Sequence, residues 1–285
     1  MMKTQAYVSI ALASIMGTVS LGVHANSPWG AEVGTYQLSY SRVHDSFDQK
    51  FLGTEDATDI AEISQSTDWI NFATGLTDTI SLAVQMGYTS SEWDMNDITY
   101  HGLADSVVAV QWEQINQFAH DRLATVAWRM AAVIAGNYQR SSGGRPHGPG
   151  DKANGFDSSV LMGRFVTDQF SAQGEFGYRL RLNDVPDEVF FNLGMNFSVT
   201  QHWGASLNWA TKVAVEGGDI NDSDFKGEFH KTREDRSTID ANVGLNINGI
   251  SGALGVARQI DVGGIGGARN TGKSTVVHLS MGYAF

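Results

Sequence analysis

The sequence predicts an all-β fold: a transmembrane antiparallel β-barrel of about 12 strands. Three observations predict this fold. Apolar and polar residues alternate over long runs, short turns alternate with long polar connections, and the chain opens with a secretory leader. After that leader, no stretch approaches the roughly 18 apolar residues that a membrane helix requires.

The N-terminal segment 1–25 has the three parts of a secretory signal peptide. Lys3 gives a positive start, an apolar run follows, and small side chains lead up to Ala25. We expect cleavage between Ala25 and Asn26, which leaves residues 26–285 as a single barrel domain. No Cys follows the cleavage position, so the sequence offers no attachment point for a lipid anchor.

The composition excludes some classes of function. The formal charge is −12, and the acidic balance makes the chain a poor candidate for binding nucleic acid, so no nucleic-acid partner is expected. Because the chain has no Cys, an exported protein of this size must be stabilised by hydrogen bonding and packing rather than by disulfides. The 32 glycines and four prolines fit a β protein punctuated by turns. We expect no cofactor.

Five segments before the C-terminal one show the alternation of a strand with one apolar face. They are residues 80–88, 170–181, 189–199, 203–209 and 239–247. Several of these runs last about 10 residues, the length that crosses a bilayer when tilted, whereas soluble strands are commonly about 5–6 residues long. Tyr and Trp gather near the strand ends, as interfacial girdles require. Three less regular strands are expected near 60–74, 106–117 and 156–166. Counts of 10 or 14 strands are therefore also compatible with the sequence.

The C-terminal segment shows the alternation most plainly. One face carries Val277, Leu279, Met281, Tyr283 and Phe285, and the other carries His278, Ser280, Gly282 and Ala284. The chain ends on an aromatic residue. We expect Tyr283 and Phe285 to form the signal that the barrel-assembly machinery recognises.

The connections alternate in length. Short turns occur at 75–78, 165–168 and 198–201, each opening into a new strand, and form a weak repeat of the hairpin unit. Longer polar stretches lie between them, at about 44–58, 92–105, 139–156, 183–187, 216–236 and 263–273. Short periplasmic turns and long external loops are typical of outer-membrane barrels. The expected location is thus the bacterial outer membrane, with lipid and lipopolysaccharide around the barrel.

Two loop motifs resemble ligand sites but lack the required context. Residues 267–274 satisfy the phosphate-loop pattern, yet an alternating β run follows where phosphate binding needs a helix. The acidic loop 219–224 has Asp224 where a calcium loop has Gly, and His230 where it has Glu. No metal site is assigned, although loose binding of a divalent cation at this acidic loop is an open alternative.

Polar residues on the inner faces of the strands form the most informative set. The expected lumen-lining residues are Gln85, Arg129, Gln173, Glu175, Arg179, Arg181, Asn192, Asn196, Asn208, Lys212, Asp240, Asn242, Asn246 and His278. Glu175 and Arg179 share one face of a strand but are four residues apart, so their contacts should run through neighbouring strands. Such residues either set the selectivity of a wetted pore or satisfy one another across a closed lumen. A barrel of about 12 strands is wider than its side chains usually fill, which favours a pore or ligand cavity.

An enzyme is the least favoured reading. Asp240 and Ser280 could approach His278 inside the barrel, but no nucleophile motif accompanies them and a polar lumen produces such neighbours by chance. We therefore predict no catalytic residues.

Two stretches resemble a known family. Residues 27–30 and 34–40, followed by 48–51, resemble the opening of barrels grouped under the MetA pathway of phenol degradation and of the XagA-like proteins. Residues 75–78 with 80–82, and later Gly87-Tyr88, match that family's most recognisable turn and strand. The resemblance covers the whole mature chain. It implies an outer-membrane channel or transporter, in some cases encoded with hydrocarbon-degradation genes, and supplies no catalytic residues.

The sequence therefore predicts a barrel that passes a small-molecule solute by diffusion through a polar-lined lumen, with apolar or aromatic compounds as the cargo that the resemblance implies. The competing prediction is a structural or interaction barrel whose lumen is plugged by its own side chains and whose external loops bind a partner.

Overall fold

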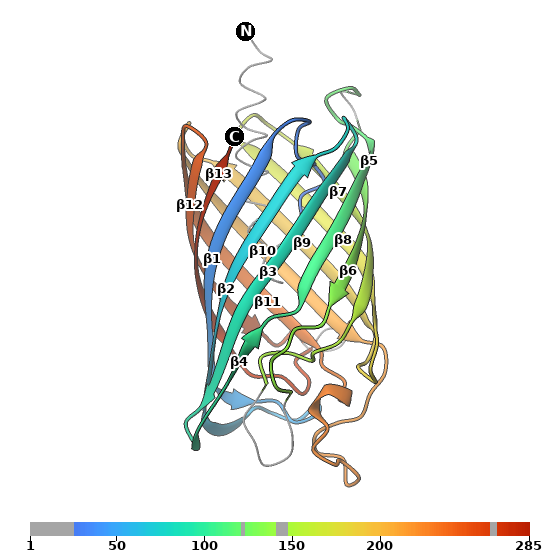
Figure 1. Cartoon of the computed structure of the whole chain (residues 1–285), viewed down its shortest axis with the longest axis vertical. Coiled ribbons are helices and arrows are strands. Elements are labelled where there is room, and N and C mark those ends of the chain that lie inside the picture. The colour runs from blue at the N-terminus through green and yellow to red at the C-terminus, as the bar shows by residue number, and fades with distance from the viewer. Residues whose placement is uncertain (1–25, 121–122, 141–147, 263–266) are drawn as a thin grey trace.

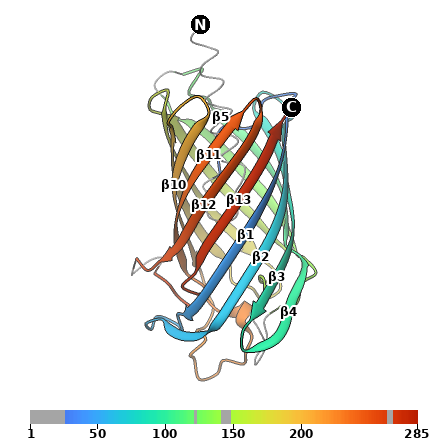
Figure 2. The same cartoon turned by 90° about the vertical axis from the view of Figure 1, so that its left-hand side faces the viewer.

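The computed structural model describes residues 26–120, 123–140, 148–262 and 267–285, and the predicted signal peptide lies outside them. The described chain forms one antiparallel sheet rolled into a barrel (Figures 1 and 2). Its wall consists of β1 (Tyr36–Lys50), β2 (Thr58–Gly75), β3 (Ile80–Trp93), β5 (Ser106–Ile115), β6 (Thr125–Ile134), β7 (Gly155–Phe165), β8 (Phe170–Arg181), β9 (Glu188–Ser198), β10 (Trp203–Ala214), β11 (Arg236–Ile247), β12 (Ile250–Ile260) and β13 (Thr275–Ala284). The helical part of the described chain is η1 (Phe229–Lys231), and no described helix is long and apolar enough to span a membrane.

Neighbouring wall strands pair in order, and β1 closes the barrel by pairing with both β2 and β13. At the seam, Tyr36 and Phe285 exchange backbone hydrogen bonds of 2.9 and 3.0 Å. Closure leaves no open sheet edge in hydrocarbon, where unsatisfied backbone groups would be costly. The prediction of a 12-stranded antiparallel barrel is confirmed.

Two of the predicted loops include residues that form strands in the structure. The predicted loop 92–105 contains a strand, β4 (Asn96–Leu103), which pairs with the outer part of β3. The predicted loop 44–58 begins too early, because β1 continues to Lys50 opposite β2. Polar strands that extend beyond the apolar belt lose the alternation on which the sequence prediction relied. Figure 2 shows the β3–β4 hairpin at the end of the barrel that carries the long loops.

The outer face of the barrel is an apolar belt. Exposed side chains on this face include Leu38, Ile70, Met86, Leu254 and Met281. Tyr88 and Tyr178 are exposed toward the end with the long loops, while Trp112, Trp128 and Trp203 are exposed toward the end with the short turns. Apolar side chains flanked by aromatic girdles are the exterior that a bilayer stabilises.

The short turns share one hydrogen-bond pattern. Thr77, Thr167 and Thr200 each accept, through Oγ1, two backbone N–H groups of the turn that follows, at 3.0–3.3 Å. A threonine hydroxyl thereby satisfies amides that the ladder leaves unpaired at the turn. This shared geometry is the physical basis of the weak repeat that the sequence shows. By the usual arrangement of such barrels, these turns are periplasmic and the long loops are external.

Asn270 ties the external loops together. Its backbone adopts a left-handed conformation with φ of 50°, which Asn tolerates. The side-chain Oδ1 accepts hydrogen bonds from the amides of Gly53 (2.8 Å) and Ile220 (3.1 Å). The Nδ2 group donates to the carbonyls of Gly218 (3.4 Å) and Arg233 (2.6 Å). One side chain therefore holds three external loops.

The phosphate-loop pattern is part of this loop arrangement. Residues 267–274 lead directly into β13, and no helix follows, as the sequence predicted.

The carboxylate of Asp219 in the acidic loop 219–224 is bound by another residue of the external loops. Arg269 donates to both carboxylate oxygens of Asp219, at 2.7 and 2.6 Å, and this hydrogen bonding lowers the pKa of Asp219. Within the described ranges, no group of three or more His, Cys, Asp or Glu side chains could hold a metal ion.

Replacing Asn270 by Ala is expected to loosen the external loops. The change leaves several loop backbone groups without their partner, at a cost of about 1–3 kcal/mol. Trypsin cleavage after Lys226 or Lys231 should become about tenfold faster, because these sites are cut from the locally opened state. Asn221→Ala, which removes one exposed hydrogen bond to Glu55, is the matched control and should change little. Equal cleavage rates for the two variants would contradict the role of Asn270.

Candidate functional site: the barrel lumen

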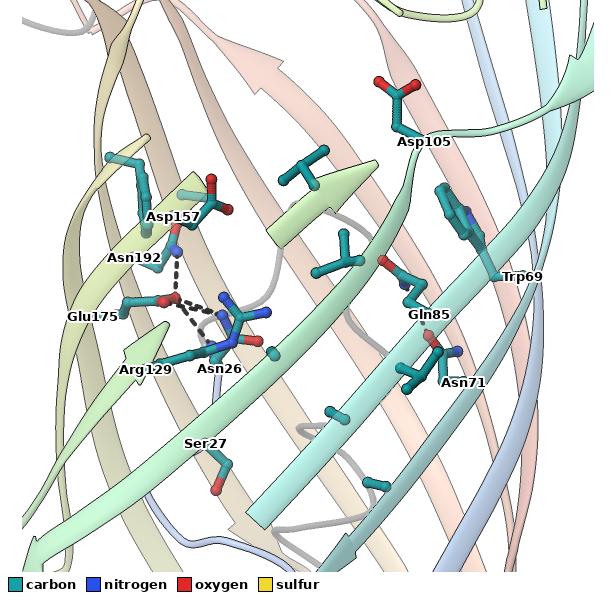
Figure 3. Close-up of a pocket in the computed structure, with 18 of the residues that line it drawn as sticks. Asn26, Ser27, Trp69, Asn71, Gln85, Asp105, Arg129, Asp157, Glu175 and Asn192 are labelled. Carbon is teal, nitrogen blue, oxygen red and sulfur yellow. Dashed lines mark hydrogen bonds between the residues drawn. The ribbon is translucent and has the colours of Figure 1, made fainter. Parts of the chain in front are cut away.

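The lumen encloses a cavity of about 550 Å³ (Figure 3). Eight of the predicted lumen residues line it: Gln85, Arg129, Glu175, Arg179, Arg181, Asn192, Lys212 and His278. The contacts of Glu175 and Arg179 run through the neighbouring strands β7 and β9, as their spacing predicted. The volume is in the range of small-molecule sites.

The other predicted residues do not line this cavity. They are Gln173, Asn196, Asn208, Asp240, Asn242 and Asn246. Asn242 and Asn208 donate to Asp240 Oδ2, at 2.6 and 3.4 Å, and Asn196 donates to Ser171 at 3.3 Å. Gln173 is buried and Asn246 is half-buried. Four of these residues, Asn196, Asn208, Asp240 and Asn242, thus form hydrogen bonds within the wall.

His278 also contacts one of these residues. Its Nε2 lies 2.9 Å from Asp240 Oδ1, and both side chains are buried. Ser280 also is buried, two residues along the same strand face. A hydrolytic triad needs the Ser hydroxyl within hydrogen-bond reach of the His. No such contact joins Ser280 and His278 among the hydrogen bonds of the described residues, so the arrangement gives no support to an enzyme.

Part of the cavity lining is apolar. Strands β2, β3, β5 and β6 contribute Trp69, Ala83, Val107, Ala109 and Val133, and the same strands also contribute polar groups such as Asn71, Gln85 and Gln111. Trp69 projects into the lumen in Figure 3, and its ring lies against Gly87, where a Cβ atom would come within 2.5 Å of the ring. The small residues in this part leave the space that the cavity occupies.

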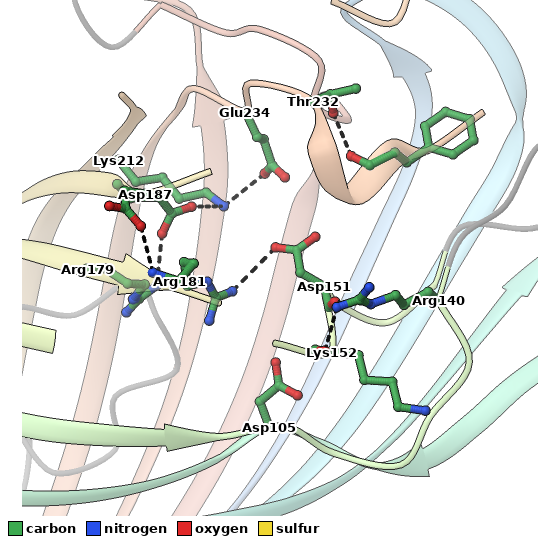
Figure 4. Close-up of polar contacts among 12 residues, drawn as sticks. Asp105, Arg140, Asp151, Lys152, Arg179, Arg181, Asp187, Lys212, Thr232 and Glu234 are labelled. Carbon is green, nitrogen blue, oxygen red and sulfur yellow. Dashed lines mark hydrogen bonds and ion pairs between the residues drawn. The ribbon is translucent and has the colours of Figure 1, made fainter. Parts of the chain in front are cut away.

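The lumen also carries a network of paired charges, which we call the charged band (Figure 4). It consists of Asp45, Asp151, Asp157, Arg179, Arg181, Glu188, Lys212, Glu234 and Arg236. Arg179 is its centre. The guanidinium forms two 2.9 Å contacts with Asp157 and one of 3.1 Å with Glu188. Asp157 is 3% exposed and Glu188 6%, so this pairing compensates two buried carboxylates.

The charged band continues around the external half of the lumen. Lys212 contacts Glu188 at 3.4 Å and Glu234 at 3.1 Å, and Arg181 contacts Asp151 at 3.4 Å. Burial and the neighbouring Glu234 raise the pKa of Asp151 to about 6. The band therefore extends over several strands and contains one carboxyl group, that of Asp151, whose pKa lies above its ordinary value.

A second hollow of about 750 Å³ opens among the external loops. Its lining residues are Ala135, Arg140, Lys152, Asn183, Asp184, Glu228, His230 and Lys231. Burial and the nearby Arg140 lower the pKa of His230. This hollow carries charges of both signs and lies at the end of the barrel from which a solute outside the cell would approach.

The N-terminal segment 26–30 lies inside the barrel. Pro28 is fully buried and Trp29 is 4% exposed. The Trp29 ring packs against Phe165 with 4.6 Å between centroids. Gln111 donates through Nε2 to the carbonyls of Ser27 (3.1 Å) and Pro28 (2.9 Å). The segment is thus held by both packing and hydrogen bonds.

Gly163 makes room for this segment. A Cβ atom at Gly163 would lie 2.6 Å from Pro28 Cγ and 3.0 Å from the Trp29 ring. At the tip of the segment, Asn26 donates through Nδ2 to both oxygens of Glu175, at 3.0 and 2.9 Å. The segment therefore reaches the floor of the cavity, where Figure 3 shows Asn26 beside Glu175.

Arg129 differs from the other cations of the lumen. It is half-buried and lines the cavity, yet makes no hydrogen bond or ion pair with any residue that the structure describes. Arg179, Arg181, Lys212 and Arg236 each have a carboxylate partner. Arg129 therefore presents an uncommitted guanidinium to the cavity.

Several residues of the lumen were missed from the sequence. They are Asn26, Asp45, Trp69, Gln111, Asp151, Asp157, Glu188, Glu234 and Arg236. Asp157 lies in an irregular strand, and Glu188 and Arg236 lie at strand starts, where alternation gives little information. The inward orientation of Asp157 could have been predicted, because Asp157, Ser159 and Leu161 occupy every second position of the strand and therefore share one face. The segment 26–30 has no alternation of apolar and polar residues from which its insertion into the barrel could have been predicted.

Comparisons with known proteins agree with this architecture. The sequence matches no protein-family model and no curated protein. Among solved structures, the COG4313 outer membrane channel from Pseudomonas putida F1 is similar, with a TM-score of 0.72 and 12% identity over 92% of this chain and 100% of that one. The translocator domain of the autotransporter NalP from Neisseria meningitidis has a TM-score of 0.55 and 13% identity, covering 99% and 98% of the two chains.

A third similar structure is the KdgM porin in complex with disordered oligogalacturonate. Its TM-score is 0.50 and its identity 8%, over 87% of this chain and 99% of that one. At these identities the likeness concerns the fold. The closed 12-stranded barrel and its apolar belt make this chain a β-barrel protein of the bacterial outer membrane.

Proposed function

We propose that this protein is an outer-membrane channel for small molecules that diffuse through its lumen. The observation that carries the proposal is the 550 Å³ cavity, which lies between the charged band and the segment 26–30 and is not filled by side chains. A barrel that served only as a scaffold would gain packing energy by filling this space. The similar COG4313 protein is described as an outer membrane channel, which supports the same role for this chain.

The lining suggests the class of solute. Trp69, Val107 and Ala109 give the cavity an apolar part, and Arg129 offers an unpaired cation. A small molecule with an apolar or aromatic body and one anionic group would bury its body against this apolar part and pair its charge with the guanidinium. The family resemblance seen in the sequence points to the same apolar or aromatic cargo.

The test is conductance of the refolded protein in a planar bilayer. We expect stable ion-conducting levels, and a reduction of the current when benzoate is added. Arg129→Gln should weaken this effect of benzoate about tenfold, as expected for the loss of one charge-assisted hydrogen bond. Arg258→Gln removes the same charge from the exposed outer face and should leave it unchanged.

A second candidate function is supported by a specific observation. The cations of the charged band are paired within the barrel, as a self-plugged lumen would require. In that case the external loops would bind a partner and the lumen would serve stability alone. A correctly folded barrel that is electrically silent would favour this second function and overturn the channel. If the protein conducts ions but benzoate does not change the current, the channel function would stand and the proposed anionic solute would be refuted.

A further inference from the structure

Glu175 occupies an unusual electrostatic position. Its carboxylate is 1% exposed and accepts hydrogen bonds from Ser159 Oγ (2.8 Å), Asn192 Nδ2 (2.9 Å) and Asn26 Nδ2. All three donors are neutral groups. No Lys, Arg or His of the described ranges forms an ion pair with Glu175, in contrast to the charged band, where Asp157 and Glu188 each have a cation. A buried carboxylate without a cation is costly.

The backbone nitrogen of Asn26 is the remaining donor. It lies 3.4 Å from Glu175 Oε2. This atom is also the one that signal-peptide cleavage would expose, because the sequence predicts cleavage between Ala25 and Asn26. A signal peptidase hydrolyses this peptide bond with one water molecule. The hydroxyl goes to the Ala25 carboxyl group, and Asn26 gains a free amine. Free α-amines have an ordinary pKa of about 7.7–8.0 and so bind a proton at pH 7.

We propose that Glu175 is a binding site for a primary ammonium group, and that its ligand is the α-ammonium of the chain's own processed N-terminus. Cleavage converts a single neutral N–H donor into a cation with three donors, at the position where the buried carboxylate lacks one. The ion pair then fixes the segment 26–30 inside the barrel. Processing of the leader and the final shape of the lumen are thereby linked.

The fit of the segment makes the position of the ammonium specific. Trp29 is held against Phe165, and the carbonyls of Ser27 and Pro28 are held by Gln111. These contacts fix the chain three residues or fewer from Asn26. One extra residue in an extended segment moves the terminus by about 3.3 Å, which is enough to break the ion pair.

Chemical labelling of the amine tests the proposal without relying on transport. The mature barrel is treated with an amine-acetylating reagent, and mass spectrometry compares the acetylation rates of Asn26 and of the exposed Lys226. In the wild type, the α-amine should react at least about tenfold more slowly than in Glu175→Gln, because it reacts only after the segment opens. An α-amine that reacts equally fast in both proteins would overturn the proposal, as would a mature chain that does not begin at Asn26.

A second variant keeps Glu175 intact. Insertion of one Gly between Asn26 and Ser27 moves the ammonium while preserving the lumen wall, and should expose the amine to acetylation as Glu175→Gln does. Insertion between Val33 and Gly34, beyond the contacts of the segment, should leave the amine protected. Equal protection in both insertion variants would also refute the ion pair. An electrically silent barrel with a protected amine would refute the channel but leave this inference standing.

Discussion

Deletion of residues 26–30 is expected to raise the single-channel conductance by about twofold or more, because the current through a wetted pore depends on its narrowest part. The segment inserts a buried Pro and Trp into the barrel, beneath the cavity. Its removal takes away packed atoms while leaving the wall strands and their ladder unchanged, since the segment precedes β1. The variant should therefore still fold and insert.

Bilayer recordings of the deletion variant and the full-length protein measure this effect. Val33→Ala is a suitable control, because Val33 is exposed, lies in the same N-terminal stretch and contacts β2 through its backbone. It should conduct like the wild type. If the deletion left the conductance unchanged, the segment would not obstruct the route of the ions.

Replacement of Arg179 by Met is expected to destabilise the barrel by about 3 kcal/mol. The Met side chain fills a similar volume but leaves Asp157 buried without the cation that contacts both of its oxygens. Glu188 would lose one cation and keep the other, Lys212. The main cost is therefore the uncompensated charge of Asp157, rather than lost attraction across the lumen.

Urea unfolding of the refolded protein in lipid vesicles measures this free energy. Arg42→Met provides the matched control, because its ion pair with Asp68 spans 3.6 Å between two exposed side chains and should contribute less than about 1 kcal/mol. A second substitution, Asp157→Asn, should restore part of the stability lost in Arg179→Met, since it removes the unpaired charge. Equal losses for Arg42→Met and Arg179→Met would contradict a structural role for the charged band.

The turns illustrate what local sequence could predict. The pattern of an apolar residue followed by Thr at Leu76-Thr77 and Val199-Thr200 marks hairpins, because the hydroxyl satisfies amides only a few residues away. The outward faces were predictable for a similar reason, since bilayer contact requires an apolar side chain at every second residue. Loop limits were less predictable. β4 lies beyond the apolar belt, so its alternation carries no such constraint.

The sequence by itself determined the class of fold, the outward faces of the strands and most cations of the lumen, because these follow from the two-residue period of a strand. Which charges meet was decided only by the tertiary structure. The partners Asp157 and Glu188 reach Arg179 from neighbouring strands through the register of the closed barrel. The insertion of Asn26 toward Glu175, 149 residues away, likewise depends on shape and buried charge. Neither shape nor buried charge produces a repeating pattern in the sequence.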